Sequence, residues 1–296
     1  MNYYNEIKTE LINNEITKRV KDYSKNRSDL NTYYNVGKLL SEAGKHYGEG
    51  IIKEYSDRLS SELNIKYSVR TLYKIIKYFN YMNKQKVPTV SAKLSWSHYD
   101  ELLKLTDENI INYYIKISEE QNLSVRELRK KIKSNEYERL DEKTKKKLET
   151  KEDLKLPDLV KNPLQIRNTS GNNEISEKIL QKLILEDIPY FLDELGNGFT
   201  FVRNEYKIKM GDRYNYIDLL LFNYEFNCFV VVELKVTELK KEHIGQIEFY
   251  MNYIDKNLKN INQDKIIGII ICKKENKYVI EYCSDDRIIS REYELV

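Results

Sequence analysis

The chain has 296 residues, enough for two domains that each bury a hydrophobic core. Its net charge is only +3, so the chain as a whole is not a strongly basic nucleic-acid binder, and affinity for DNA would need local patches. Residues 1–20 are polar and the longest apolar runs have strand length, which indicates neither a signal peptide nor a membrane span, and we expect a cytoplasmic protein.

The first domain, residues 1–140, is predicted to be helical. Ser68 and Asp107 can cap helix starts, and Ser124 with Glu127 forms a capping box. Short helices joined by brief polar turns are compatible with a helix-turn-helix or winged-helix arrangement, although many helical bundles show the same spacing.

Residues 141–173 differ in composition from both flanks. A charge-dense run leads to Pro157 and Pro163, and then to the sequence NTSGNN. Proline, glycine and asparagine after a charged run are typical of a connection between domains. We therefore expect a linker or connecting arm here, followed by a second domain over 174–296.

The second domain alternates helix and strand patterns. The predicted elements are, in order, an amphipathic helix over 175–196, a strand over 196–210, a hairpin turn at 211–213, two apolar strands through YNYIDLLLF and CFVVVELKV, a polar helix over 240–255 and a fully apolar strand over 265–274. A short turn at 223–227 would make the two central strands antiparallel.

Those two central strands carry ionisable residues. Side chains alternate faces along a strand, so Glu233 and Lys235 share a face, and the turn can bring Asp218 beside them. Burying these groups is costly unless they are paired or bind a metal. Two carboxylates beside an ammonium suit Mg²⁺ or Mn²⁺, which can activate water and stabilise charge on a phosphodiester.

The competing interpretation is a buried ion pair with no chemical role. For an isolated pattern of this length the ion pair would be preferred, because Asp, Glu and Lys are abundant in this chain. The ordered series around the pattern, helix, three strands, helix and strand, favours the metal site instead.

This order, with Asp218 and the Glu233-x-Lys235 pair on the second and third strands, resembles the PD-(D/E)xK nuclease superfamily, in particular its YhcG-like branch. The resemblance spans residues 175–295 and is carried by the strings FLDELGNGFTFV, YIDLLLF, CFVVVELKV, GQIEFYMNYID and IGIIIC. It implies a restriction-endonuclease-like α/β domain with a central mixed sheet.

The resemblance also implies a metal site. Asp218 and Glu233 would hold Mg²⁺ or Mn²⁺, with the backbone carbonyl of Leu234 as a third ligand. Lys235 would orient the attacking water or help to deprotonate it. Intact Asp218, Glu233 and Lys235 argue for an active enzyme.

Further residues follow from the resemblance. Gln246, with Tyr250 one turn later, would support the site or touch the DNA backbone. Many superfamily members carry a glutamate in the first core helix where this chain has Gln181, so the site would be one charge poorer, with lower metal affinity or activity. Glu177 and Glu186 lie on the same helix and could substitute, although Glu186 fits an ordinary solvated residue better.

The first domain shows a resemblance of its own. LSWSHYDELLKL and the later SVRELRKKIK resemble the helical N-terminal domain that accompanies YhcG-like nuclease domains and is thought to bind DNA. Three basic residues of this region are candidate phosphate contacts, Arg126, Arg129 and Lys130. Most charge runs are nevertheless solvated faces.

Some other polar and aromatic residues are assigned to structure rather than to chemistry. We expect Trp96 to pack in the core and His98 to satisfy a backbone group or a helix start. Tyr214 and Tyr216 could lie beside a scissile nucleotide, but half-buried strand packing is the preferred role, and Glu205 fits a surface residue better than a metal ligand.

The sequence therefore predicts a two-domain, metal-dependent nuclease that holds DNA with its N-terminal helices and hydrolyses a phosphodiester in its C-terminal domain. Superfamily members often act as dimers, which suggests a homodimer or higher homo-oligomer. The alternatives are a non-catalytic DNA-binding or scaffold protein that keeps the nuclease fold, for which Gln181 is the main support, and a helical interaction module.

Overall fold

The computed structural model describes residues 3–19, 25–63, 65–85, 93–150, 152–169, 171, 174–283 and 285–296. The chain divides into two compact units, Met1–Ser134 and Asn135–Val296, which we describe separately. No helix in the described ranges is long and apolar enough to cross a lipid bilayer.

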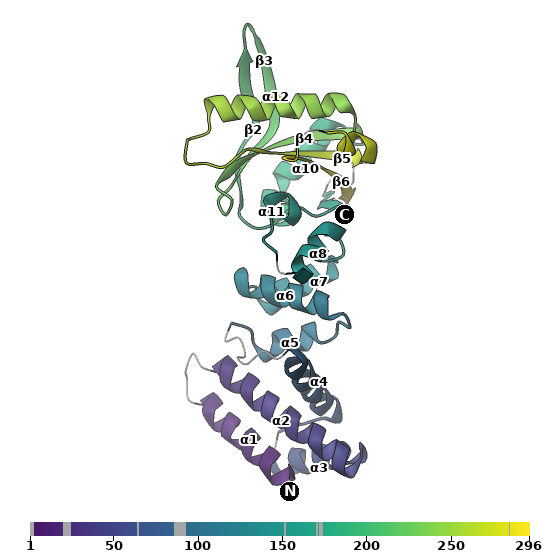
Figure 1. Cartoon of the computed structure of the whole chain (residues 1–296). Helices are drawn as coiled ribbons and strands as arrows, with labels where there is room; N and C mark the ends of the chain where they lie inside the picture. Colours follow the sequence, from purple (N-terminus) through teal and green to yellow (C-terminus); the bar gives the residue numbers. More distant parts are fainter. Residues whose placement is uncertain are drawn as a thin grey trace. The chain divides into compact units, whose positions relative to one another are not determined.

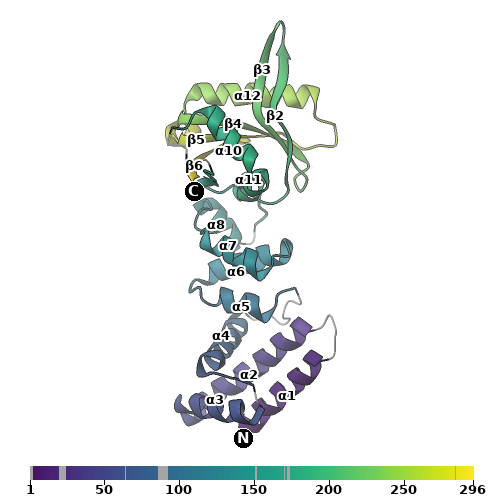
Figure 2. The same cartoon turned by 180° about the vertical axis from the view of Figure 1, so that it is seen from behind.

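The described part of unit 1 is helical, as predicted (Figures 1 and 2). Its helices are α1 (Tyr3–Arg19), α2 (Lys25–Tyr47), α3 (Gly50–Leu63), α4 (Val69–Gln85), α5 (Trp96–Leu102), α6 (Glu108–Glu120) and α7 (Val125–Lys133). These residues include no strand, so the wing of a winged helix is not present in the part of unit 1 that is described. A helix-turn-helix stays a prediction.

In unit 1, α2 contacts α1, α3, α4 and α5, whereas α6 and α7 pack against α5 and against each other. A Cβ at Gly37 of α2 would lie 2.6 Å from the Cβ of Phe79 and 2.7 Å from the backbone oxygen of Ile75, so α2 and α4 approach closely only with glycine here. Leu40 and Leu72 are fully buried beside this crossing.

The predicted helix starts of unit 1 are confirmed. The Glu127 N–H donates to Ser124 Oγ at 3.3 Å, and the Ser124 N–H donates to Glu127 Oε2 at 2.7 Å, which completes the capping box. Asp107 accepts the N–H of Asn109 at 2.7 Å. The Thr71 N–H donates to Ser68 Oγ at 3.2 Å.

Unit 2 is built on a six-stranded mixed sheet of order β1-β6-β5-β4-β3-β2. The strands are β1 (Leu164–Ile166), β2 (Phe199–Met210), β3 (Arg213–Asn223), β4 (Cys228–Glu238), β5 (Ile267–Lys274) and β6 (Ile288–Leu295). β2, β3 and β4 are antiparallel neighbours, whereas β4, β5, β6 and β1 run parallel. The predicted α/β domain with a central mixed sheet is therefore confirmed.

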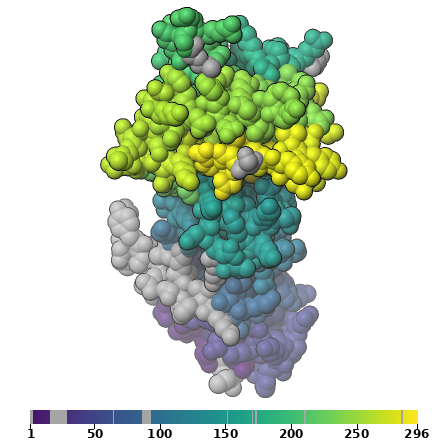
Figure 3. All heavy atoms as spheres, turned by 45° about the horizontal axis from the view of Figure 1, so that its top comes forward, coloured from purple at the N-terminus to yellow at the C-terminus, as the bar shows by residue number. Residues whose placement is uncertain are grey.

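Helices cover both faces of this sheet. α10 (Glu177–Glu186) and α11 (Ile188–Leu195) pack on one face and α12 (Lys241–Asn257) on the other, whose outer side is visible in yellow-green in Figure 3. Val232 and Leu234 of β4 join the core under α10, and Val231 joins the core under α12, as strand alternation requires. β5 is buried on both faces, as its apolar run predicted.

The single helix predicted over 175–196 was wrong, because α10 and α11 are separate helices. Asp187 leaves the helical conformation, with φ −138° and ψ 61°, and its side chain accepts the N–H of Tyr190 at 3.2 Å to start α11. Pro189 follows in the first turn of α11, where its missing N–H is tolerated.

The segment in which we expected a connection, 141–173, contains regular structure. It holds the helices α8 (Glu142–Thr150) and α9 (Leu156–Leu159), and the edge strand β1. β1 pairs in parallel with β6, with Leu164 opposite Tyr293. The compact unit that includes the sheet accordingly begins at Asn135.

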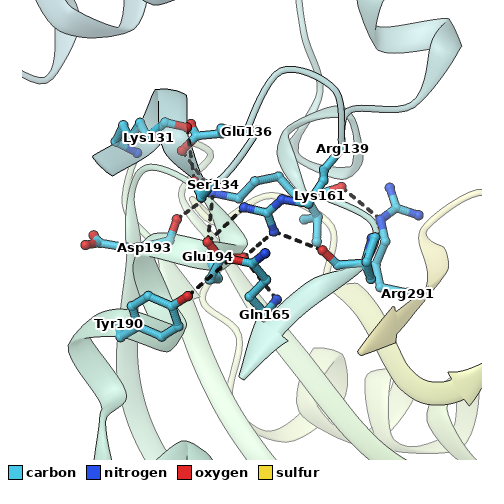
Figure 4. Close-up of polar contacts among 12 residues, drawn as sticks. Lys131, Ser134, Glu136, Arg139, Lys161, Gln165, Tyr190, Asp193, Glu194 and Arg291 are labelled. Atoms are coloured by element: carbon cyan, nitrogen blue, oxygen red, sulfur yellow. Dashed lines mark hydrogen bonds and ion pairs between the residues drawn. The ribbon is translucent and has the colours of Figure 1, made fainter. Parts of the chain in front are cut away.

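A buried charge network ties the start of unit 2 to α11 (Figure 4). Glu194 accepts from both terminal nitrogens of the Arg139 guanidinium, with Nη2 to Oε1 at 3.1 Å, and also from the Gln165 N–H at 3.0 Å. Lys161 Nζ lies 3.5 Å from Glu136 and 3.9 Å from Glu194. Arg139, Lys161 and Glu194 are all at least nine-tenths buried, so the desolvation cost of each charge must be offset by its ion-pair and hydrogen-bond partners.

We expect Glu194→Ala to lower the free energy of unfolding of unit 2 by about 3–5 kcal/mol, because it leaves two buried cations with too few partners. Urea denaturation followed by circular dichroism measures the change. The control is Glu142→Ala, which removes an exposed partner of Lys145 and should cost about 1 kcal/mol or less. A loss no larger than that of the control would contradict this account of the network.

Candidate active site

β3 and β4 bring Asp218 and Glu233 together. The antiparallel ladder pairs Leu219 with Val232, so the next position places Asp218 beside Glu233. Backbone pairing between β3 and β4 ends at Leu219 and Val232, and beyond it the Asp218 side chain bonds to β4: its Oδ2 accepts the N–H of Leu234 at 2.8 Å. The two carboxylates from separate apolar strands are thus fixed side by side.

Of the two carboxyl groups, that of Glu233 has the less favourable electrostatic environment. Its side chain is 2% exposed; Oε2 lies 3.3 Å from Lys235 Nζ, and Oε1 is buried without a hydrogen-bond partner. Burial, followed by the negative charge of Asp218, raises the pKa of Glu233 to about 8, although Lys235 acts in the opposite direction. Burial also raises the pKa of Asp218.

These observations fit a divalent cation. A buried carboxylate oxygen with no donor, next to a second carboxylate, is an arrangement that a cation would stabilise. Within the described ranges no three His, Cys, Asp or Glu side chains form a cluster that could hold a metal ion. Mg²⁺ commonly binds through one or two protein carboxylates because it keeps several waters, so a pair of carboxylates such as Asp218 and Glu233 fits its chemistry.

Lys235 completes this cluster from the same face of β4. Its ammonium lies 3.3 Å from Glu233 Oε2 and 3.8 Å from Glu177 Oε2 of α10. Burial and the charge of Lys235 lower the pKa of His243, in the first turn of α12, so this ring also belongs to the surroundings of the ammonium. From the sequence, Glu177 was expected only as a possible substitute ligand. Its position beside Lys235 depends on how α10 packs on the sheet, which the sequence pattern does not show.

Gln181 lies against the strand that carries Asp218. Its Nε2 donates to the backbone oxygen of Asp218 at 3.0 Å, and the side chain is almost fully buried. The amide therefore holds β3 in place where the resemblance led us to expect a glutamate. Glu186, the other possible substitute, accepts from Thr169 Oγ1 at 2.7 Å and lies near Lys182 instead.

α12 contributes the predicted Gln246 and Tyr250 pair. Gln246 Nε2 donates to the Tyr250 hydroxyl at 3.1 Å, across one helical turn. Burial raises the pKa of Tyr250, and the negative charges of Glu233 and Asp218 raise it further, so the hydroxyl lies within electrostatic reach of both carboxylates. The Leu234 N–H is held by Asp218, and a ligand role for the Leu234 carbonyl stays a prediction.

Glu205 of β2 is exposed, as expected, and is also a neighbour of the site. The β2–β3 register pairs Asn204 with Leu219 and Tyr206 with Ile217, which sets Glu205 opposite Asp218. Its charge raises the pKa of Asp218, and its backbone has φ +46° in mid-strand. A left-handed glutamate in a strand leaves no sequence pattern by which to find it.

In unit 1, the basic residues Arg126, Arg129 and Lys130 are exposed on α7. Arg129 is paired with Glu101, with Nη2 to Oε1 at 2.5 Å, which leaves Arg126 and Lys130 as the better candidates for phosphate contact.

Trp96 and His98 have structural surroundings, as expected. Trp96 packs against Tyr33 at a ring distance of 4.5 Å and against Tyr78. The His98 ring contacts Ser95 at the start of α5, and its Nε2 lies 2.9 Å from the Leu123 carbonyl oxygen.

Two family models match the chain. Residues 157–295 match the YhcG PDDEXK nuclease domain, and residues 9–139 match the DUF1016 N-terminal domain. A curated relative, "Putative nuclease YhcG" of Escherichia coli (strain K12), is 25% identical over 219 residues, which are 70% of this chain and 58% of the relative. The chain thus spans less than two thirds of the length of that relative.

Solved structures resemble part of the chain. A repair endonuclease from Pyrococcus abyssi is 17% identical, with a TM-score of 0.29, over 43% of this chain and 49% of its own. EndoMS in a complex described as EndoMS-dsDNA2 is 20% identical, with a TM-score of 0.29, over 43% and 48%.

The match to the YhcG PDDEXK nuclease domain covers all six strands of the sheet, from β1 to β6. The chain is therefore similar to the DUF1016 N-terminal domain family over residues 9–139 and to the YhcG PDDEXK nuclease domain family over residues 157–295.

Proposed function

We propose that this protein is a metal-dependent nuclease that hydrolyses phosphodiester bonds of DNA in unit 2. The observation that carries the proposal is the buried, unpartnered Oε1 of Glu233 beside Asp218 and Lys235. Asp218 and Glu233 would hold Mg²⁺ or Mn²⁺, with the Leu234 carbonyl as a further ligand. A bound ion of this kind supplies Lewis-acid stabilisation of phosphate charge and lowers the pKa of a bound water.

The chain's own residues then have separate tasks. The Leu234 N–H orients the Asp218 carboxylate, and Gln181 holds the backbone at Asp218, so β3 presents its ligand in a fixed position. Lys235, whose ammonium lies between Glu233 and Glu177, would orient the attacking water or help to deprotonate it. Gln246 and Tyr250 support the site from α12.

The proposal extends to the partners and the setting of the protein. DNA is the substrate, unit 1 contributes DNA affinity through Arg126 and Lys130, and the protein acts in the cytoplasm, as a homodimer or higher homo-oligomer if both strands of a duplex are cut. A non-catalytic protein that keeps the nuclease fold is the second candidate, because Gln181 occupies the position of a glutamate ligand. It has the weaker support, since Asp218, Glu233 and Lys235 are all present and clustered.

Cleavage tests the proposed reaction directly. We expect wild-type protein with Mg²⁺ or Mn²⁺ to cut at least one member of a panel of linear, nicked, branched and single-stranded DNAs. Asp218→Asn should lower that rate by at least about 100-fold, since even groups that only orient metal ligands contribute about 10- to 100-fold. The matched control is Asp193→Asn, an exposed carboxylate on α11. Binding of DNA by wild type without any metal-dependent cleavage would instead favour the non-catalytic candidate.

The pH dependence of stability separates a metal site from an ion pair. Burial raises the pKa of the Glu233 carboxyl from 4.5 to about 8 on folding, so the free energy of unfolding of metal-free wild type should fall as pH rises through this window. Glu233→Gln should lack this fall and melt above wild type at pH 9 in EDTA. Mg²⁺ should raise the melting temperature of wild type but not of the variant. A variant less stable than wild type at every pH, with no effect of Mg²⁺ on either, would indicate a structural ion pair.

DNA contact by unit 1 is testable through salt dependence. Arg126→Gln combined with Lys130→Gln should weaken binding of the full chain to DNA in EDTA and reduce the slope of log affinity against log salt by about 2, one for each lost phosphate contact. Lys53→Gln combined with Lys66→Gln, two exposed lysines elsewhere in unit 1, is the control. Equal slopes for all three proteins would remove α7 from the interface.

A further inference from the structure

The hairpin of β2 and β3 extends well beyond the rest of the sheet (Figure 1). β3 pairs with β4 only over Leu219–Asn223, whereas it pairs with β2 from Arg213 to Asn223. Residues 206–217 therefore form a ribbon of two strands, which we call the ribbon. In Figure 3 its green atoms rise beyond the yellow-green surface of α12.

The two faces of the ribbon differ in character. Ile208 and Ile217 are fully buried in the core that α12 covers, so one face of the ribbon is an ordinary packing surface. The opposite face follows from the register, in which Lys207 pairs with Tyr216 and Lys209 pairs with Tyr214. Directly paired residues share a face, so two lysines and two tyrosines occupy the same side.

This second face, which we call the Lys-Tyr face, is open to solvent. Tyr214 is 49% exposed and Tyr216 is 51% exposed, and both lysines are exposed as well. Lys207 Nζ lies 3.7 Å from the centroid of the Tyr214 ring, which shows that the diagonal pair meets on this side. Each tyrosine is therefore half-buried, as expected, and leaves the other half of its side-chain surface open to solvent.

The Lys-Tyr face lies next to the candidate active site along the chain. Tyr216 precedes Asp218 by two residues on β3, and Lys207 follows Glu205, whose strand position is opposite Asp218. Between 206 and 217 the only acidic residue is Asp212, at the turn, against the basic residues Lys207, Lys209 and Arg213. The face thus offers positive charge and aromatic rings beside the position where a phosphodiester would be cut.

We propose that the Lys-Tyr face binds an unpaired strand of nucleic acid next to the cut phosphodiester, with Tyr214 and Tyr216 stacking on bases and Lys207 and Lys209 contacting phosphates. Exposed rings beside lysines form the combination that single-strand binding surfaces use, because every base has a face on which an aromatic ring can stack. Paired bases in a duplex do not offer these faces, so the two tyrosines favour the single strand. This inference rests on the proposed nuclease function for the identity of the neighbouring site.

The test is binding of the full chain, in EDTA, to a short fluorescein-labelled single-stranded DNA, measured by fluorescence anisotropy. Stacking is worth about 5- to 100-fold for each ring, so Tyr214→Ala combined with Tyr216→Ala should weaken binding at least about 20-fold. Tyr214→Phe combined with Tyr216→Phe keeps the rings and should bind within a few-fold of wild type. The control is Tyr224→Ala combined with Tyr278→Ala, two exposed tyrosines of unit 2 outside the ribbon.

A labelled hairpin duplex of the same sequence supplies the comparison. The alanine pair should change duplex affinity far less than single-strand affinity, while circular dichroism shows the fold intact. Equal losses on both DNAs, a loss in the phenylalanine pair as large as in the alanine pair, or no loss in the alanine pair would each overturn the proposal. The measurement needs no metal or cleavage, so its failure is distinguishable from failure of the proposed nuclease function.

Discussion

The buried Glu233 carboxylate beside Asp218 is the constraint on which the rest of unit 2 depends. Two carboxylates in one apolar setting repel each other, and burial raises the pKa of both. Lys235 offsets this repulsion only in part, because its ammonium reaches Glu233 Oε2 and leaves Oε1 without a donor. A cation that binds both carboxylates would offset their repulsion. Without one, the surrounding structure still holds the two groups side by side.

The fold supplies that rigidity from both sides of the sheet. Gln181 of α10 holds the backbone at Asp218, and the Leu234 N–H fixes its side chain. On the other face, Tyr250 of α12 lies within electrostatic reach of the same carboxylates. Away from the site, the Glu194 network anchors α11 to the start of unit 2, so α11 is attached by buried charge as well as by apolar packing.

Much of this arrangement could be predicted from the sequence, because two of its determinants are local. Alternation along β4 places Glu233 and Lys235 together, and the short turn after β3 returns the chain so that Asp218 meets them. Apolar patterns likewise predicted β5 as a strand buried on both faces and α12 as a polar helix. The helix caps at Asp107 and Ser124 could also be predicted from the sequence, since each cap depends on residues within one helical turn.

The remainder depends on contacts that no local pattern encodes. Residues 177–195 form two helices because the backbone angles of Asp187 are not helical. β1 is a strand because β6 pairs with it. Glu205 approaches Asp218 through a left-handed conformation in mid-strand, and Glu177 reaches Lys235 through the packing of α10 on the sheet. The open Lys-Tyr face is a matter of register and of how far β4 extends, which composition does not reveal.

Diffraction from crystals of the full chain soaked in Mn²⁺, with data collected to locate the ion by its anomalous scattering, tests directly whether Asp218 and Glu233 hold a metal. We expect an anomalous peak between the carboxylates of Asp218 and Glu233, with Glu233 Oε1 as a ligand. An empty site in saturating Mn²⁺, with Glu233 bound only to Lys235, would contradict it and leave the cluster as a structural ion pair.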